Sequence, residues 1–194
     1  MAGRGPDFTI SAAPAARTSL VGGATTFTTT LTPMNGFAAP VTLAATGLPA
    51  GATATWSGGT LTVATPAGVA PGAYPLTITA SSGVLSHAAQ VTLTVSLGDY
   101  ALSAAPATLT VTRGGTAATT VSTSGTHAGA VTMSATSVPA AATATFTVNP
   151  VAVPGVTRLT IRTTSATPRG TFTVRVTGTS GPLAHNTTLT LTVR

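Results

Sequence analysis

The sequence predicts an all-β chain that folds as two tandem antiparallel β-sandwiches. The segment 47–56, GLPAGATATW, returns in altered form as 137–146, SVPAAATATF, which indicates one module present twice. Between its turns the chain alternates apolar residues with threonine, the period-two pattern of strands with one buried face. Proline and glycine interrupt this pattern at short intervals, and no segment keeps a helical period.

The two copies align along nearly the whole chain. Matching landmarks are Asp7 and Asp99, Phe8 and Tyr100, Val41 and Val131, Tyr74 and Phe172, His87 and His185, and Val95 and Val193. The alignment predicts an N-terminal arm over residues 1–6, a first domain over 7–97 and a second domain over 98–194. The connection at 96–99 leaves about two free residues, so we expect restricted hinge motion and an end-to-end arrangement.

Each copy supplies about seven or eight short strands, as a two-sheet sandwich requires. In chain order, the apolar strand positions are Phe8 and Ile10, the segment 27–31, Leu61 and Val63, Leu76 and Ile78, and Val91, Leu93 and Val95, then Leu159 and Ile161, Phe172, Val174 and Val176, and Leu189, Leu191 and Val193. Threonine suits the outward positions because its branched Cβ favours extended backbone while its hydroxyl stays hydrated. The segment around Ala117, Thr119 and Val121 is less apolar than its counterpart 27–31.

Differences in length between the copies fall in two places. The first copy is longer before Val41, and the second is longer between Phe146 and Arg158. Insertions are tolerated in loops, where binding residues also concentrate. We therefore expect interaction loops that contain Met34, Asn35 and Phe37 in the first copy, and Asn149, Val151 and Val153 in the second.

The repeated turn differs between the copies at both of its glycines. Ser137 replaces Gly47, and Ala141 replaces Gly51. If the glycines use left-handed backbone angles, the second turn is expected to follow another path.

The composition combines few charges with an ordinary apolar content. Only 5% of residues are charged, 43% are hydrophobic, and there are no cysteines. Disulfides and thiolate metal sites are thereby excluded, and no apolar run is long enough for a membrane span or a signal-peptide core. The net charge of +6 is uneven, because the segment 98–194 holds six of the eight arginines. A basic second domain favours a protein partner or, alternatively, an anionic polymer or polysaccharide.

Several segments resemble a known class of repeat. They are 7–11 (DFTIS), 47–51 (GLPAG), 71–78 (PGAYPLTI) and 91–95 (VTLTV). These segments resemble the immunoglobulin-like repeats, of actinobacterial type, that occur as tandem accessory domains in bacterial secreted and surface proteins. The resemblance implies tandem immunoglobulin-like β-sandwiches that act as spacers, adhesion modules or stabilisers, with no family active site to carry over.

Tyr74 and Leu76 resemble the Tyr-x-Cys of immunoglobulin strand F, with leucine in place of the cysteine. The phenol of Tyr74 is then expected to bond back to a loop carbonyl, as in a tyrosine corner. Phe172 lacks the hydroxyl, so this feature is confined to the first domain.

Catalytic chemistry finds little support in the sequence. The two acids, Asp7 and Asp99, occupy the same position of two different domains, so paired carboxylates are not expected. His87 and His185 recur at equivalent places, where we expect a ring nitrogen bonded to a loop carbonyl. His127 has no counterpart and is placed in a loop. The sequence thus predicts no enzyme, no metal site and no cofactor.

Two further groups of residues, an aromatic pair and a set of arginines, are candidates for a role in the core or in binding. Trp56 and Phe146 follow the repeated turn and are expected in the core, with a sugar-stacking platform as the alternative. Arg158, Arg162 and Arg175 all have outward parity, and they would form a basic stripe, with Arg169 at its rim, if their strands face the same way. Stacking aromatics are missing beside them, so specific nucleic-acid binding is not expected.

The sequence therefore favours a non-catalytic structural or adhesive module. The first hypothesis is a spacer or protein-interaction element on an extracellular or cell surface, without membrane insertion. A virion decoration, tail or filament subunit and a carbohydrate-binding accessory module remain as alternatives.

Overall fold

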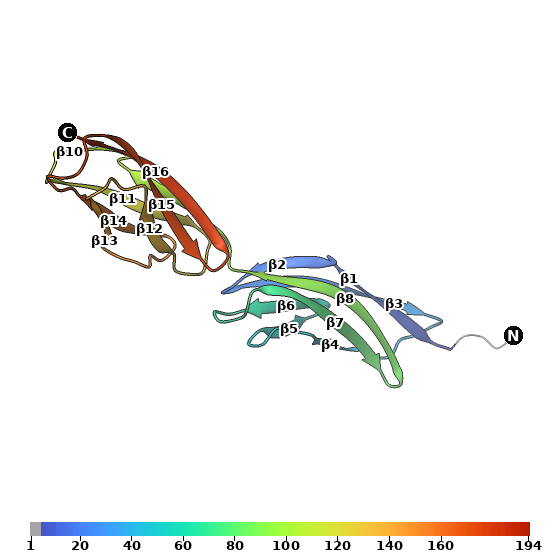
Figure 1. Ribbon diagram of the computed structural model, residues 1–194. Helices are drawn as coiled ribbons and strands as arrows, with labels where there is room; N and C mark the ends of the chain where they lie inside the picture. Colours follow the sequence, from blue (N-terminus) through green and yellow to red (C-terminus); the bar gives the residue numbers. More distant parts are fainter. Residues whose placement is uncertain (1–4) are drawn as a thin grey trace. The chain divides into compact units, whose positions relative to one another are not determined.

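The computed structural model describes residues 5–194, so residues 1–4 of the expected N-terminal arm lie outside it. The described residues form sixteen strands in four sheets (Figure 1). The chain divides between Leu97 and Gly98 into unit 1 and unit 2. Within the described residues, no helix has the length and apolarity needed to span a bilayer.

Unit 1 consists of two four-stranded sheets. One has the order β1-β3-β6-β5 and the other β2-β8-β7-β4. The strands are β1 (Asp7–Ala13), β2 (Ala16–Leu20), β3 (Gly23–Met34), β4 (Thr42–Thr46), β5 (Thr53–Ser57), β6 (Thr60–Thr65), β7 (Gly72–Ser82) and β8 (Leu85–Ser96).

Unit 2 repeats this topology strand for strand. Its sheets have the orders β13-β14-β11-β9 and β10-β16-β15-β12. The strands are β9 (Tyr100–Ala105), β10 (Thr108–Val111), β11 (Thr116–Gly125), β12 (Thr132–Thr136), β13 (Thr143–Phe146), β14 (Gly155–Arg162), β15 (Gly170–Ser180) and β16 (Leu183–Val193).

The topology is that of an immunoglobulin-like sandwich. β1, β3, β6 and β5 correspond to strands A, B, E and D, and β4, β7 and β8 correspond to C, F and G. An additional strand pairs in parallel with the last strand of each unit, β2 with β8 and β10 with β16. The prediction of two tandem immunoglobulin-like antiparallel sandwiches is confirmed.

The predicted alternation of strand residues produces one core per unit. The unit 1 core contains Phe27, Leu61, Val63, Val69, Leu76, Ile78, Val91, Leu93 and Val95, and the unit 2 core contains the equivalent positions of β14, β15 and β16. Trp56 and Phe146 pack against these cores as partly buried residues, as expected. Thr119 stands on the inward face of β11 in place of an apolar residue. Its buried hydroxyl is satisfied because it donates a hydrogen bond to the Pro106 carbonyl at 2.7 Å.

The tyrosine corner is confirmed in unit 1. The Tyr74 hydroxyl donates to the Ala70 carbonyl at 2.9 Å, just before β7. The prediction for the repeated turn is wrong, because Ser137 and Ala141 keep the left-handed angles of the glycines they replace. The φ angles are +87° at Gly47, +84° at Gly51, +60° at Ser137 and +53° at Ala141. Hydroxyls of Thr164 and Thr167 donate to the Ala141 carbonyl, which helps to hold the turn in this path.

Candidate functional site

An Asp–His pair closes one end of each unit. His87 Nε2 lies 2.7 Å from Asp7 Oδ1, and His185 Nε2 lies 2.7 Å from Asp99 Oδ1. Asp7 begins β1 and His87 lies on β8, so the pair joins the two sheets of the sandwich. An ionised carboxylate offers only acceptors, so Nε2 donates the hydrogen bond. We call this arrangement the Asp–His clasp.

A buried aromatic ring packs edge-on against the histidine of each clasp. The ring centroids of Phe8 and His87 are 4.8 Å apart at an interplanar angle of 82°, and Tyr100 and His185 have the same values. Phe8 is 1% exposed and Tyr100 is 3% exposed. The Tyr100 hydroxyl also donates to the Gly178 carbonyl at 2.7 Å, a bond that Phe8 cannot make.

The clasp favours the ionised form of each aspartate. The hydrogen bond from His87 is the largest cause that lowers the pKa of Asp7, followed by the backbone N–H of Phe8. For Asp99, the backbone N–H of Tyr100 lowers the pKa most, and the bond from His185 comes second. Burial raises the pKa of the Tyr100 phenol. Both clasps therefore hold a carboxylate at neutral pH.

This geometry suits a structural link between sheets. The expectation that His87 and His185 bond to loop carbonyls is wrong, because the first residues of each domain lie beside the strand that carries the histidine. Asp7 and Asp99 do belong to different units, and each meets its own histidine. Among residues 5–194, no three His, Cys, Asp or Glu side chains gather as a metal site would require.

His127 takes in unit 2 the position that Phe37 holds in unit 1. The rings of Phe8 and Phe37 are 4.9 Å apart, and those of Tyr100 and His127 are 5.3 Å apart. His127 lies in the expected loop, but it is 2% exposed and does have a counterpart. Its Nε2 lies 2.8 Å from Ser180 Oγ, whereas its buried Nδ1 has no hydrogen-bond partner among the described residues.

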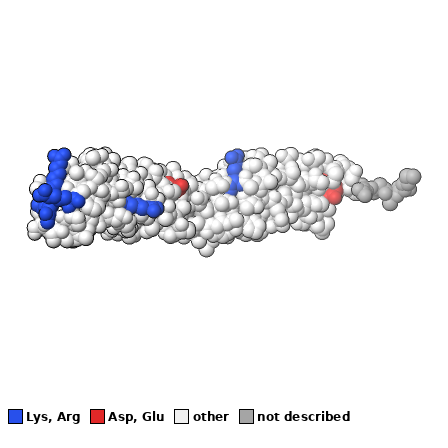
Figure 2. Space-filling model, turned by 45° about the horizontal axis from the view of Figure 1, so that its top comes forward, with Lys and Arg blue, Asp and Glu red and all other residues white. Residues whose placement is uncertain are grey.

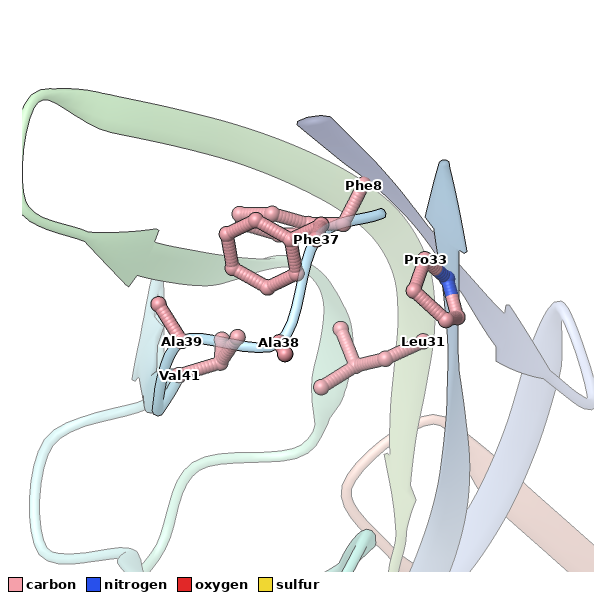
Figure 3. A pocket seen from close by; sticks show the side chains of 7 residues that line it. All are labelled: Phe8, Leu31, Pro33, Phe37, Ala38, Ala39 and Val41. Atoms are coloured by element: carbon pink, nitrogen blue, oxygen red, sulfur yellow. The ribbon is translucent and has the colours of Figure 1, made fainter. Parts of the chain in front are cut away.

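The corresponding end of unit 1 contains an open pocket of about 320 Å³ with an apolar lining (Figure 3). The residues that line it are Phe8, Leu31, Pro33, Phe37, Ala38, Ala39 and Val41. Figure 3 shows the Phe8 and Phe37 rings beside each other, with Leu31 and Pro33 on the neighbouring strand. The pocket can therefore make apolar contacts with a partner, and no charged side chain lines it.

The first predicted interaction loop contributes one of its three named residues to this pocket. Phe37 lines it, and Met34 is exposed at the end of β3. The Asn35 side chain donates to the Gly5 carbonyl at 3.1 Å. Val84, at the tip of the β7–β8 hairpin, is fully exposed and lines a neighbouring hollow that Phe37 also lines.

The second predicted interaction loop serves the fold of unit 2. Val151 is 2% exposed and forms a bridge with Val131, and Val153 packs partly buried against the core. The Asn149 side chain accepts a bond from the Met133 N–H and donates to the Met133 carbonyl, each at 2.8 Å. The insertion therefore pairs with the edge strand β12, and its role as an interaction loop stays a prediction.

The predicted basic stripe does not form on one face. Arg158 and Arg162 lie on β14, whereas Arg175 lies on β15 in the other sheet of the sandwich. All three side chains are exposed, so they point outward from opposite sheets. The parity of a residue along a strand predicts whether it points inward or outward, but it does not identify the sheet to which the strand belongs.

The structure instead groups arginines at one end of unit 2. Arg162 ends β14, Arg169 precedes β15, and Arg194 follows β16. The Arg113 backbone N–H donates to the Arg194 carbonyl at 2.9 Å, which brings Arg113 to the same end. The sequence prediction did not include Arg113 and Arg194. A signal was available, because the equivalent residues of the first copy are neutral.

Comparison with solved structures supports the fold assignment. The titin domains Z1Z2, in complex with telethonin, match with a TM-score of 0.54 over 100% of this chain and 97% of that chain, at 14% identity. Domains 4 and 5 of the S-layer protein SbsC match with a TM-score of 0.46 over 96% of this chain and 97% of that chain, at 13% identity. No protein-family model and no curated protein match the sequence. The match to the titin domains, at 14% identity, shows the immunoglobulin-like fold alone and nothing about function.

Proposed function

We propose that this chain is a non-catalytic structural module, in which two immunoglobulin-like units act as a stiff spacer or protein-interaction element on an extracellular surface. We also propose a bacterial origin, which the sequence resemblance implies. The observation that carries the spacer role is the connection between the units. β8 ends at Ser96 and β9 begins at Tyr100, and so short a connecting segment supports restricted motion between the units.

Contacts within unit 2 hold part of this connecting segment in place. The Asp99 carbonyl accepts hydrogen bonds from the backbone N–H groups of Thr126 and His127, at 3.0 and 3.1 Å. Gly98 has a φ of +76°, and a Cβ atom there would lie 2.6 Å from the Thr126 carbonyl oxygen. The chain is thus fixed to unit 2 from Gly98 onward, which supports a restricted hinge.

Two other features support a structural or interaction role. Threonine occupies most outward strand positions, which hydrates the faces of the sheets without many charges. The apolar loop end of unit 1, with its pocket and the exposed Met34 and Val84, offers contact area for a protein partner. The described acids are each bonded to a histidine that links the sheets, an arrangement that supports a non-catalytic role.

Distance measurements between the units test the spacer role. The chain has no cysteine, so the double variant S57C/T145C accepts one spin label in each unit at exposed strand positions. Double electron–electron resonance should give a narrow distance distribution. A matched variant with Gly-Ser-Gly-Ser inserted after Leu97 should give a clearly broader one. Equally broad distributions in both proteins would refute the spacer role.

The proposed location has its own test. Antibodies against the folded chain should label intact cells of the source organism, and external protease should remove the signal. Labelling that requires permeabilised cells would contradict an extracellular surface.

A further inference from the structure

One end of unit 2 carries four exposed arginines, which we call the arginine end: Arg113, Arg162, Arg169 and Arg194. They lie where β10, β14 and β16 end and where β15 begins. Thr116 pairs with Arg162, and Gly170 pairs with Val193, so backbone pairing brings these segments together. Figure 2 shows basic side chains gathered at the end of unit 2 that bears the C-terminus in Figure 1.

The fold does not require these charges, because unit 1 builds the same end without them. The repeat places Val21, Ala64, Pro71 and Ser96 at the four equivalent positions. The backbone bond from Val21 N–H to the Ser96 carbonyl is 2.9 Å long, and so is the bond from Arg113 N–H to the Arg194 carbonyl. At all four positions, unit 2 therefore carries a positive charge where the same fold in unit 1 carries a neutral residue.

No described carboxylate side chain neutralises the arginine end. The ion pairs of residues 5–194 are the two Asp–His clasps. Asp99 lies at the opposite end of unit 2, where β9 begins and β11 ends. The Arg113 guanidinium donates to the Ser165 carbonyl, a neutral acceptor. Among residues 5–194, the four guanidinium groups thus have no carboxylate side chain as a partner.

Buried threonines fix the loops that present these charges. The Thr163 hydroxyl contacts the Thr112 and Gly115 carbonyls at 3.2 and 3.0 Å, on either side of the Arg113 turn. Thr167 donates to the Ala141 carbonyl at 2.9 Å and holds the loop that leads to Arg169. Loops ordered before binding lose less conformational entropy when a ligand arrives.

We propose that the arginine end is a binding site for an anionic polysaccharide, a polymer that bears repeated carboxylate or sulfate groups among hydroxyls. Guanidinium groups bind both anions with paired hydrogen bonds. The neighbouring Thr112, Thr116 and Ser165 are exposed and add hydroxyl groups that suit sugar hydroxyls. This inference is independent of the spacer role, because it concerns a surface within unit 2.

The surroundings of the arginines favour this ligand over other polyanions. Nucleic-acid sites normally add aromatic rings on which bases stack, and membrane sites add apolar residues that insert. The large apolar residues that unit 2 exposes are Val148 and Val156, which lie away from the four arginines. Protein interfaces likewise rely on aromatic and apolar anchors at their centre.

Binding of the intact chain to immobilised polymers tests the proposal. The probes are polygalacturonate, which bears carboxylates, and dextran sulfate, with neutral dextran as the blank. The wild type should bind at least one anionic polymer, more weakly as salt screens the charges. The triple variant R162Q/R169Q/R194Q should lose about ten- to hundredfold in affinity, since exposed charge pairs contribute little individually. Arg113 is left intact because it bonds to Ser165.

The matched control is R17Q/R158Q/R175Q, which removes the same number of charges from other exposed positions. It should retain the wild-type affinity within about twofold, since distant exposed charges are screened. Equal losses in the two variants would show that net charge alone drives binding and would overturn the proposal. So would failure of the wild type to bind either polymer, or tighter binding to duplex DNA or to phosphatidylserine vesicles. Circular dichroism of each variant controls for folding.

Discussion

Asp7 Oδ1 accepts a hydrogen bond from His87 Nε2 at 2.7 Å, and this bond joins the first strand of unit 1 to its last. Unit 2 reproduces the bond between Asp99 and His185 with the same length. The sheets of each sandwich are therefore linked at one end by a charge-assisted hydrogen bond, in a chain that has no cysteine for a disulfide.

Acid should weaken both units through these clasps. The pKa of each aspartate is lowered in the folded state, so the stabilisation is fully present above the usual pKa of 3.8 and is lost as pH falls through the lower folded value. Urea unfolding followed between pH 7 and pH 2 should show this decline. The double variant D7N/D99N should show a much flatter profile, because these are the only acidic side chains in the chain. An unchanged acid dependence in the variant would contradict this role.

The fold could be predicted from the sequence, whereas the clasp could not. Alternation along β8 or β16 depends on neighbouring residues, so it reveals which side chains face the core. Asp7 and His87 are far apart in the sequence, and only the three-dimensional arrangement of strands brings them together. Their recurrence as Asp99 and His185 was the available signal, since both members of the pair are kept in both copies.

The arginines were predicted incompletely for a related reason. Outward parity correctly indicated that Arg158 and Arg175 are exposed, but the sheet of each strand depends on topology. The end of a sandwich also collects residues from turns, where alternation gives no information. Arg113 lies in such a turn, and Arg194 follows the last strand, beyond the alternating pattern.

Removing the Tyr100 hydroxyl should destabilise unit 2. Y100F leaves the buried Gly178 carbonyl without the 2.7 Å bond, a loss of about 1–3 kcal/mol in the free energy of unfolding. Y74F removes a more exposed bond to Ala70 and should cost about 0.5–1 kcal/mol in unit 1. Calorimetry of the two variants measures both effects. A larger loss for Y74F than for Y100F would contradict the role assigned to burial.

In the repeated turn, a glycine introduced in unit 2 should raise stability, whereas a glycine removed in unit 1 should lower it. A141G relieves a left-handed residue, and after the entropic cost of glycine it should stabilise unit 2 by about 0.5–1 kcal/mol. G47A should destabilise unit 1 by about 2 kcal/mol or more, because its Cβ would lie 2.3 Å from the Pro75 carbonyl oxygen and φ would be strained. Thermal unfolding measures both, with A140G as a control that should not stabilise.

The Asn149 side chain should stabilise the insertion that covers β12. Its amide makes two 2.8 Å bonds to the backbone of Met133, in the manner of a neighbouring strand. N149A removes both bonds and should lower the free energy of unfolding by about 1–2 kcal/mol.

N149D keeps the acceptor for the Met133 N–H but turns a carboxylate oxygen toward the Met133 carbonyl, so it should not restore stability. N35A removes one exposed bond to Gly5 and should cost less than about 0.5 kcal/mol. Hydrogen exchange at the Met133 amide reports directly on the pairing, and unchanged protection in N149A would show that the insertion covers β12 without this side chain.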